Sequence, residues 1–81
     1  MYYTSAQSTN NFKPFEIGYL RHIIISNDSP TEELSFNFDG GTLEMTLSKS
    51  ETIEFNWVYE RTIYIKDKVT GTHIPFRIWA W

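Results

Sequence analysis

The chain has 81 residues, enough for one small domain that is only marginally stable alone. It contains no cysteine, which excludes disulfides and thiolate metal sites. Its formal net charge is −3 and its seven Lys and Arg residues are scattered, so we expect no nucleic-acid binding. No apolar run approaches the length of a membrane span, and we expect no membrane association. The N-terminus has neither the basic n-region nor the apolar h-region of a signal peptide. This predicts a soluble protein made in the cytoplasm.

Residues 1–19 have no hydrophobic period and are rich in Ser, Thr, Asn and Gln. So polar a stretch offers little apolar surface to offset the entropy of ordering it, which is typical of a disordered tail. A purely solvated tail, however, needs no large aromatic residues. We therefore expect an extended N-terminal arm that docks on a neighbouring subunit and can be deleted without unfolding the rest, with a disordered tail as the alternative. The expected anchors are Tyr2, Tyr3, Phe12 and Phe15.

From Leu34 to Ala80, apolar and polar residues alternate almost without a break. Because a strand points successive side chains to opposite faces, this period of two predicts half-buried β-strands. Six strands are expected, at about residues 19–26, 33–39, 42–48, 52–59, 62–66 and 73–80. The residues expected to face the core from Leu34 onward are Leu34, Phe36, Phe38, Leu43, Met45, Leu47, Ile53, Phe55, Trp57, Tyr59, Ile63, Ile65, Ile74, Phe76, Ile78 and Ala80.

Turn residues separate these strands, as in Asn27–Pro30 and the hairpin signal Asp39–Gly41. The sequence therefore predicts an all-β fold: a small antiparallel β-sandwich or partly open barrel of six to seven strands, built from residues 20–81 behind the arm. Pro75 lies within the last predicted strand. Because proline has no N–H to donate to a ladder, that strand is expected to be an edge strand or to carry a bulge.

No catalytic motif is present. A Ser or Thr nucleophile needs a base within hydrogen-bond reach, and neither His22 nor His73 is flanked by a glycine-rich elbow. The two histidines would give a metal ion only two ligands. The ten carboxylates fall mostly at turns or on the polar faces of strands, which is typical of solvated surface. We therefore expect no catalytic residue, no metal, no cofactor and no enzymatic activity.

The last strand carries the most distinctive surface pattern. If its apolar residues face the core, then His73, Arg77, Trp79 and Trp81 share the opposite face. Tryptophan and arginine are enriched at binding hot spots, so we expect Arg77, Trp79 and Trp81 to contact a partner subunit. Two alternatives remain: the arm or a loop covers this face, or its aromatic planes stack on a sugar.

The order of strands and turns also carries a resemblance, through residues 23–28, 34–40, 63–66 and 76–80. It resembles that of short β-sandwich virion proteins of tailed bacteriophages, which sit on the capsid or at its connector and tail. The resemblance implies a non-enzymatic structural protein located in the virion, which binds other virion proteins or copies of itself and needs no cofactor. The alternative is a small carbohydrate-binding module used in host recognition.

Overall fold

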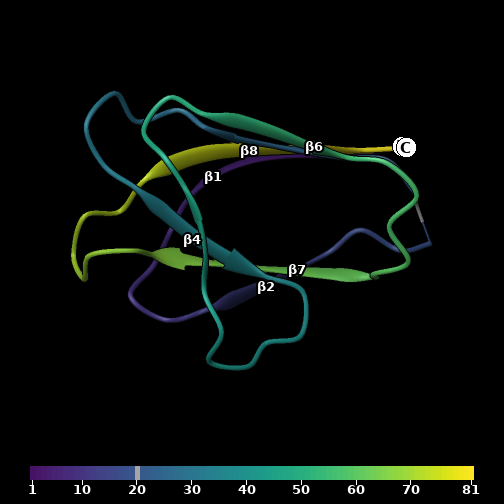
Figure 1. The fold of residues 1–81 in the computed structure, drawn as a ribbon, viewed down its shortest axis with the longest axis horizontal. Coiled ribbons are helices and arrows are strands. Elements are labelled where there is room, and N and C mark those ends of the chain that lie inside the picture. Colours follow the sequence, from purple (N-terminus) through teal and green to yellow (C-terminus); the bar gives the residue numbers. More distant parts are fainter. Residues whose placement is uncertain (20) are drawn as a thin grey trace.

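The computed structural model describes residues 1–19 and 21–81, which form two four-stranded antiparallel β-sheets in two layers (Figure 1). No α-helix occurs in these residues, so none of them belongs to a helix long and apolar enough to cross a membrane. The strands are β1 (Tyr2–Gln7), β2 (Lys13–Glu16), β3 (Ile23–Asn27), β4 (Leu34–Asn37), β5 (Met45–Leu47), β6 (Thr52–Phe55), β7 (Thr62–Asp67) and β8 (Pro75–Ala80).

The strand order is β1-β8-β3-β6 in one sheet and β2-β7-β4-β5 in the other. Each strand of the first half of the chain pairs with its counterpart in the second half: β1 with β8, β2 with β7, β3 with β6 and β4 with β5. The chain is therefore one long antiparallel hairpin, rolled up so that β3 also pairs with β8 and β4 with β7. This is the topology of a jelly roll.

The core lies between the two sheets. Aromatic side chains cross it edge to face: the Phe15 ring lies 5.3 Å from that of Phe76, and the Phe36 ring 6.1 Å from that of Phe55. Burying one such side chain stabilises a fold by roughly 1.5–3 kcal/mol. The fully or almost fully buried apolar residues are Ile17, Ile23, Ile25, Leu34, Phe36, Leu47, Ile63, Ile65, Ile74, Phe76, Ile78 and Ala80.

The N-terminal residues are not a separate arm, and that prediction is wrong. β1 pairs with β8 along its whole length, from Tyr2 opposite Ala80 to Gln7 opposite Pro75, and β2 pairs with β7. Residues 1–19 and 21–81 therefore form eight strands rather than six or seven. The segment is polar because β1 is an edge strand with one face in solvent, and only alternate residues such as Tyr2 and Ala6 pack on the core.

Each of the six predicted strands overlaps an observed one, although residue 20 of the first lies outside the described residues. The two sheets are separate, so the fold is a sandwich and not a closed barrel. The expectation for the last strand is wrong: β8 lies between β1 and β3 and is not an edge. Pro75 is tolerated there because it is the first residue of the strand. Its carbonyl oxygen still accepts a hydrogen bond from the Asp28 N–H, 2.9 Å away.

Three residues expected in the core are instead exposed: Leu43 by 72%, Trp57 by 66% and Tyr59 by 74%. All three lie beyond the ends of the strands to which the alternation assigned them. β5 begins only at Met45, and β6 already ends at Phe55. Trp57 and Tyr59 consequently belong to the loop between β6 and β7, and they become part of the candidate site.

Candidate functional site

The outer face of the β1-β8-β3-β6 sheet carries a row of large side chains centred on Trp79. Tyr3 of β1 and Ile24 of β3 are the register partners of Trp79 on its two sides. The Trp79 ring lies 5.6 Å from the Tyr3 ring, at an angle of 53°. The Arg77 guanidinium lies 4.8 Å from the centre of the Trp79 ring, a cation–π contact. The Trp79 ring therefore has a fixed position on this face.

Arg77 is itself held in place by Asp28, which follows β3. Its Nε donates to Asp28 Oδ2 at 2.7 Å and its Nη2 to Oδ1 at 2.8 Å, a bidentate pair. The hydroxyl of Ser26 also donates to Asp28 Oδ1, at 3.0 Å. The hydrogen bond from Arg77, with a smaller one from Ser26, lowers the pKa of Asp28 and outweighs the effect of burial. The carboxylate thus stays charged and keeps the guanidinium beside Trp79.

A second row places His22 between two tryptophans. The His22 and Trp81 rings are stacked, 5.6 Å apart and inclined by 17°. Their backbones exchange two hydrogen bonds of 3.0 Å, which extends the pairing of β3 with β8 by one residue. The Trp57 ring lies 5.9 Å from His22 on the other side. His22 Nδ1 lies 2.9 Å from Asn56 Oδ1, within hydrogen-bond distance.

Trp57 adopts an unusual backbone conformation, with φ at +61°. A bulky side chain in this left-handed region costs about 1–2 kcal/mol. Such strain is found where the surrounding structure imposes it, commonly at functional positions. Here the turn ends β6 and leaves Trp57 66% exposed, with its ring beside His22. We call the set formed by Tyr3, His22, Trp57, Trp79 and Trp81 the aromatic face.

Two stacked pairs extend this surface around the end of the sandwich. The Arg21 guanidinium lies 4.7 Å from the Tyr59 ring, and that of Arg61 lies 4.5 Å from the Tyr19 ring. Both tyrosine side chains are more than 70% exposed. The loop between β6 and β7 lies at the same end of the molecule as the C-terminus (Figure 1). Exposed aromatic rings therefore gather at one end of the fold.

Of the predicted partner-binding residues, the structure brings together Tyr3, Arg77 and Trp79, and Trp81 stacks on His22. Tyr2 and Phe15 instead pack against the core. Phe12 lies elsewhere, with the Lys66 ammonium 5.5 Å from its ring, in a hollow lined also by Asn10, Asn11, Gly41, Thr42 and Glu44. The sequence did not single out His22 and Trp57 as partner-binding residues. The only available signal for His22 was its place opposite the apolar face of β3.

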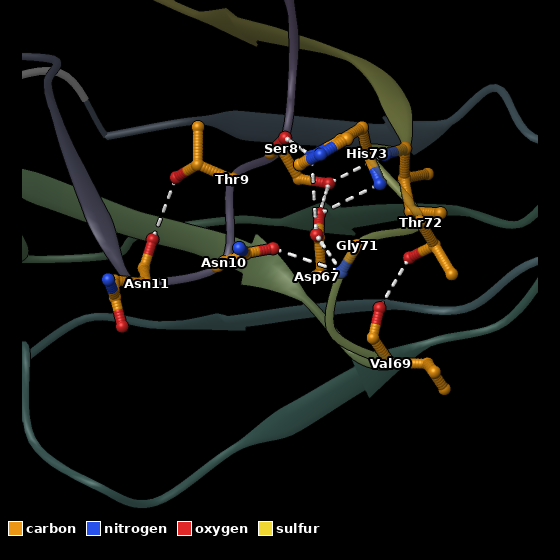
Figure 2. A network of polar contacts seen from close by, with 10 residues as sticks. Ser8, Thr9, Asn10, Asn11, Asp67, Val69, Gly71, Thr72 and His73 are labelled. Carbon is orange, nitrogen blue, oxygen red and sulfur yellow. Dashed lines mark hydrogen bonds and ion pairs between the residues drawn. The ribbon is translucent and has the colours of Figure 1, made fainter.

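A separate polar cluster joins Ser8, Asp67 and His73, the residue types of a catalytic triad (Figure 2). The Ser8 hydroxyl donates to Asp67 Oδ1 at 2.5 Å and accepts from the Ile74 N–H at 2.7 Å. The backbone N–H groups of Gly71 and His73 donate to the two oxygens of the Asp67 carboxylate, each at 3.1 Å. His73 Nδ1 lies 3.2 Å from the Ser8 carbonyl oxygen and 3.3 Å from Asp67 Oδ2.

This cluster is arranged for structure rather than for nucleophilic attack. Burial raises the pKa of Asp67, but the hydrogen bonds from Ser8 and from two backbone N–H groups together lower it by more. The net shift of the pKa is therefore downward. A carboxylate with a lowered pKa is a weak base for removing the hydroxyl proton. The Ser8 side chain is also engaged on both sides, and the residue is only 3% exposed. The cluster therefore joins the turn after β1 to the hairpin between β7 and β8, and we call it the clasp.

Within residues 1–19 and 21–81, no group of three or more His, Asp or Glu side chains is placed to hold a metal ion. Comparison with protein-family models, with curated proteins and with solved structures finds no match to this chain. The assignment of function therefore rests on the jelly-roll topology and on the chemistry of the aromatic face.

Proposed function

We propose that this protein is a non-enzymatic structural subunit of a viral particle of the tailed-phage kind, and that it binds a neighbouring subunit through the aromatic face. Jelly rolls serve as viral capsid domains and as lectin domains, which is compatible with this role. Because one fold hosts many functions, the proposal depends on the surface and not on the topology alone.

The observation that carries the proposal is the packing of the Trp79 ring against Arg77 and Tyr3. Arg77 on one side and Tyr3 on another hold the ring, while the bidentate pair with Asp28 holds Arg77. A side chain ordered before binding loses little entropy in a complex. Tryptophan, tyrosine and arginine are also the residues that dominate binding energy at protein interfaces. A preformed cluster of all three on one sheet face is suited to docking a partner subunit.

Quantitative mass spectrometry of purified particles tests this proposal. We expect the chain to be present at a fixed copy number and Trp79→Ala to reduce that number severalfold. The matched control is Val69→Ala, which removes an exposed apolar side chain from the hairpin between β7 and β8, away from the aromatic face. Absence of the chain from particles, or equal incorporation of both variants, would contradict the proposal.

A second candidate is a carbohydrate-binding module, favoured by one specific observation. Trp57 is 66% exposed, next to the polar pair His22 and Asn56. An exposed aromatic plane with hydrogen-bonding groups beside it suits the stacking of a pyranose ring. Titration of the purified protein with a glycan panel distinguishes the two roles. A monomer whose glycan binding is lost in Trp57→Ala or Trp79→Ala would favour the carbohydrate function.

A further inference from the structure

The four edges of the two sheets differ in how well they are protected. The edge strands are β1 and β6 in one sheet and β2 and β5 in the other. An open edge presents a row of backbone N–H and C=O groups that can pair with another chain. Proteins block such edges with short strands, charged side chains or proline. The strand that lacks these features is therefore the one available for pairing.

Three of the edges carry such protection. β5 has only three residues, and the four residues of β6 include Glu54. β2 contains Lys13, Pro14 and Glu16 among its four residues. The Ile17 N–H donates to the carbonyl of Arg61, so odd-numbered residues of this strand face the paired strand β7. Pro14 consequently stands on the outer side, where its missing N–H blocks pairing.

β1 has none of these features. It is the longest of the four edge strands, with six residues, and its sequence Tyr-Tyr-Thr-Ser-Ala-Gln contains neither a charge nor a proline. In the part of the chain that the structure describes, no strand pairs with its outer side. The sequence from Tyr2 to Phe12 carries no charged side chain at all. This edge is therefore open to a further strand.

The register shows which backbone groups point outward. The Ser8 N–H donates to the carbonyl of Ile74 at 2.8 Å, so even-numbered residues direct their backbone groups toward β8. Because the direction alternates along an antiparallel strand, the backbone groups of Tyr3, Ser5 and Gln7 point to the outer side. All three residues are exposed.

We propose that β1 pairs antiparallel with β1 of a second copy of this chain, about a two-fold axis at Ser5. This register places Ser5 opposite Ser5 of the second copy, and Tyr3 opposite Gln7. Every outward N–H and C=O of the three residues then has a partner, which gives six backbone hydrogen bonds. The strand is thus complementary to itself, as a two-fold interface requires. Because β1 carries no charged side chain, the pairing places no like charges opposite each other.

Pairing at this edge would join the two β1-β8-β3-β6 sheets into one eight-stranded sheet. The aromatic faces of both copies would then lie on sheets that are continuous with each other. The inference concerns the backbone edge of β1, to which Tyr3 contributes only its N–H and C=O groups, so it goes beyond the function proposed above. The two fail separately, because the substitutions used below leave Trp79 and Trp57 unchanged.

Light scattering after size exclusion tests the dimer directly. We expect the purified chain to form a dimer that dissociates on dilution. Ser5→Pro should lower its affinity at least tenfold, because it removes the outward N–H of Ser5 from each copy and leaves the pairing with β8 intact. The matched control is Thr46→Pro, which places the same residue on the β5 edge, where Thr46 is exposed. A protein that is monomeric at millimolar concentration, or equal dimerisation of the two variants, would overturn the proposal.

A cysteine variant tests the register, since the chain contains no cysteine of its own. In the proposed pairing the two Ser5 Cα atoms lie about 5.5 Å apart, within the range of a disulfide. Ser5→Cys should therefore oxidise rapidly to a covalent dimer. Gln7→Cys is the control, because four residues of offset separate the two copies of position 7 by about 14 Å. Equal crosslinking of the two variants would refute the two-fold axis at Ser5. The absence of crosslinking in both would overturn the pairing of β1 with a second copy.

Discussion

Ser8 and Asp67 are separated by 59 residues in sequence, yet the serine hydroxyl donates a hydrogen bond to the buried carboxylate. Further bonds run alongside it. The Asp67 N–H donates to the Thr9 carbonyl at 2.8 Å, and the Gly71 N–H to Asn10 Oδ1 at 2.9 Å. These contacts fasten the turn between β1 and β2 to the hairpin between β7 and β8. They join the two arms of the rolled hairpin where both pass from one sheet to the other.

The first prediction concerns this clasp. Replacing Asp67 by Asn turns one acceptor oxygen into a donor, which then faces N–H groups or the Ser8 hydroxyl. Because a buried group is left unsatisfied, we expect the free energy of unfolding to fall by about 1–3 kcal/mol. Urea denaturation measures the change, and Glu33→Gln, at an exposed position, is the isosteric control. An Asp67→Asn protein as stable as the control would show that the clasp contributes little.

The second prediction is the pH dependence of stability. The pKa values of Asp67 and Asp28 are both lowered in the folded protein. A carboxylate whose folded-state pKa lies below its unfolded value, about 3.9, stabilises the fold above that value. This contribution is lost as the pH falls through the folded-state pKa. We therefore expect the free energy of unfolding to decline below about pH 4.

Urea denaturation at a series of pH values between 7 and 2 checks this decline. Asp67→Asn should make it shallower, because one of the three carboxylates with a lowered pKa (Asp28, Glu44 and Asp67) is gone. High salt should reduce the share of the exposed pair between Asp28 and Arg77 and leave the buried carboxylate of Asp67 less affected. Equal slopes in the wild-type and variant proteins would mean that other groups control acid unfolding.

The third prediction separates the fold from the binding surface at Trp57. With φ at +61°, this position favours asparagine over a β-branched residue. Trp57→Asn should therefore be more stable than Trp57→Val by about 1 kcal/mol, and both should lose binding of partner or glycan. Thermal unfolding and a binding titration measure the two effects. Equal stability of the variants would mean that the loop relaxes to a different conformation.

The fourth prediction concerns Asn27, the last residue of β3, which is 1% exposed. Its Nδ2 lies 2.9–3.1 Å from the carbonyl oxygens of Glu32, Leu47 and Ser48, and its Oδ1 accepts from the Ser29 N–H at 2.9 Å. Asn27→Ala removes all four of these contacts from a buried site, so we expect a loss of about 2–3 kcal/mol. The control, Asn56→Ala, removes an exposed amide. Similar midpoints of urea denaturation would contradict this role.

The success and failure of the sequence predictions have physical reasons. Alternation located the buried faces of β7 and β8 because each strand is central in its sheet and fixed in register by two neighbours. It failed at Trp57, because the apolar–polar period continues past Phe55 by chance and no Gly or Pro marks the end of β6. Local pattern cannot show such a strand end.

The candidate site was predictable only where one strand supplies it. Arg77 and Trp79 share a face of β8 by simple alternation, and the structure places them together. His22 and Trp57 join that surface from other segments, through pairing between β3, β6 and the end of the chain. The pairing of β1 with β8 spans almost the entire chain, so its polar edge sequence could not be distinguished from a tail.

The last prediction follows from the correction of the N-terminal arm. Phe15 packs edge to face on Phe76 in the core, whereas Phe12 lies beside Lys66 near the surface. Phe15→Ala should therefore cost about 3 kcal/mol of unfolding free energy, and Phe12→Ala, the matched control, clearly less. Deletion of residues 1–18 removes both β1 and β2 and should abolish cooperative unfolding. If the truncated protein still shows a sharp thermal transition and the two alanine variants have equal effects, residues 1–19 are an independent arm after all.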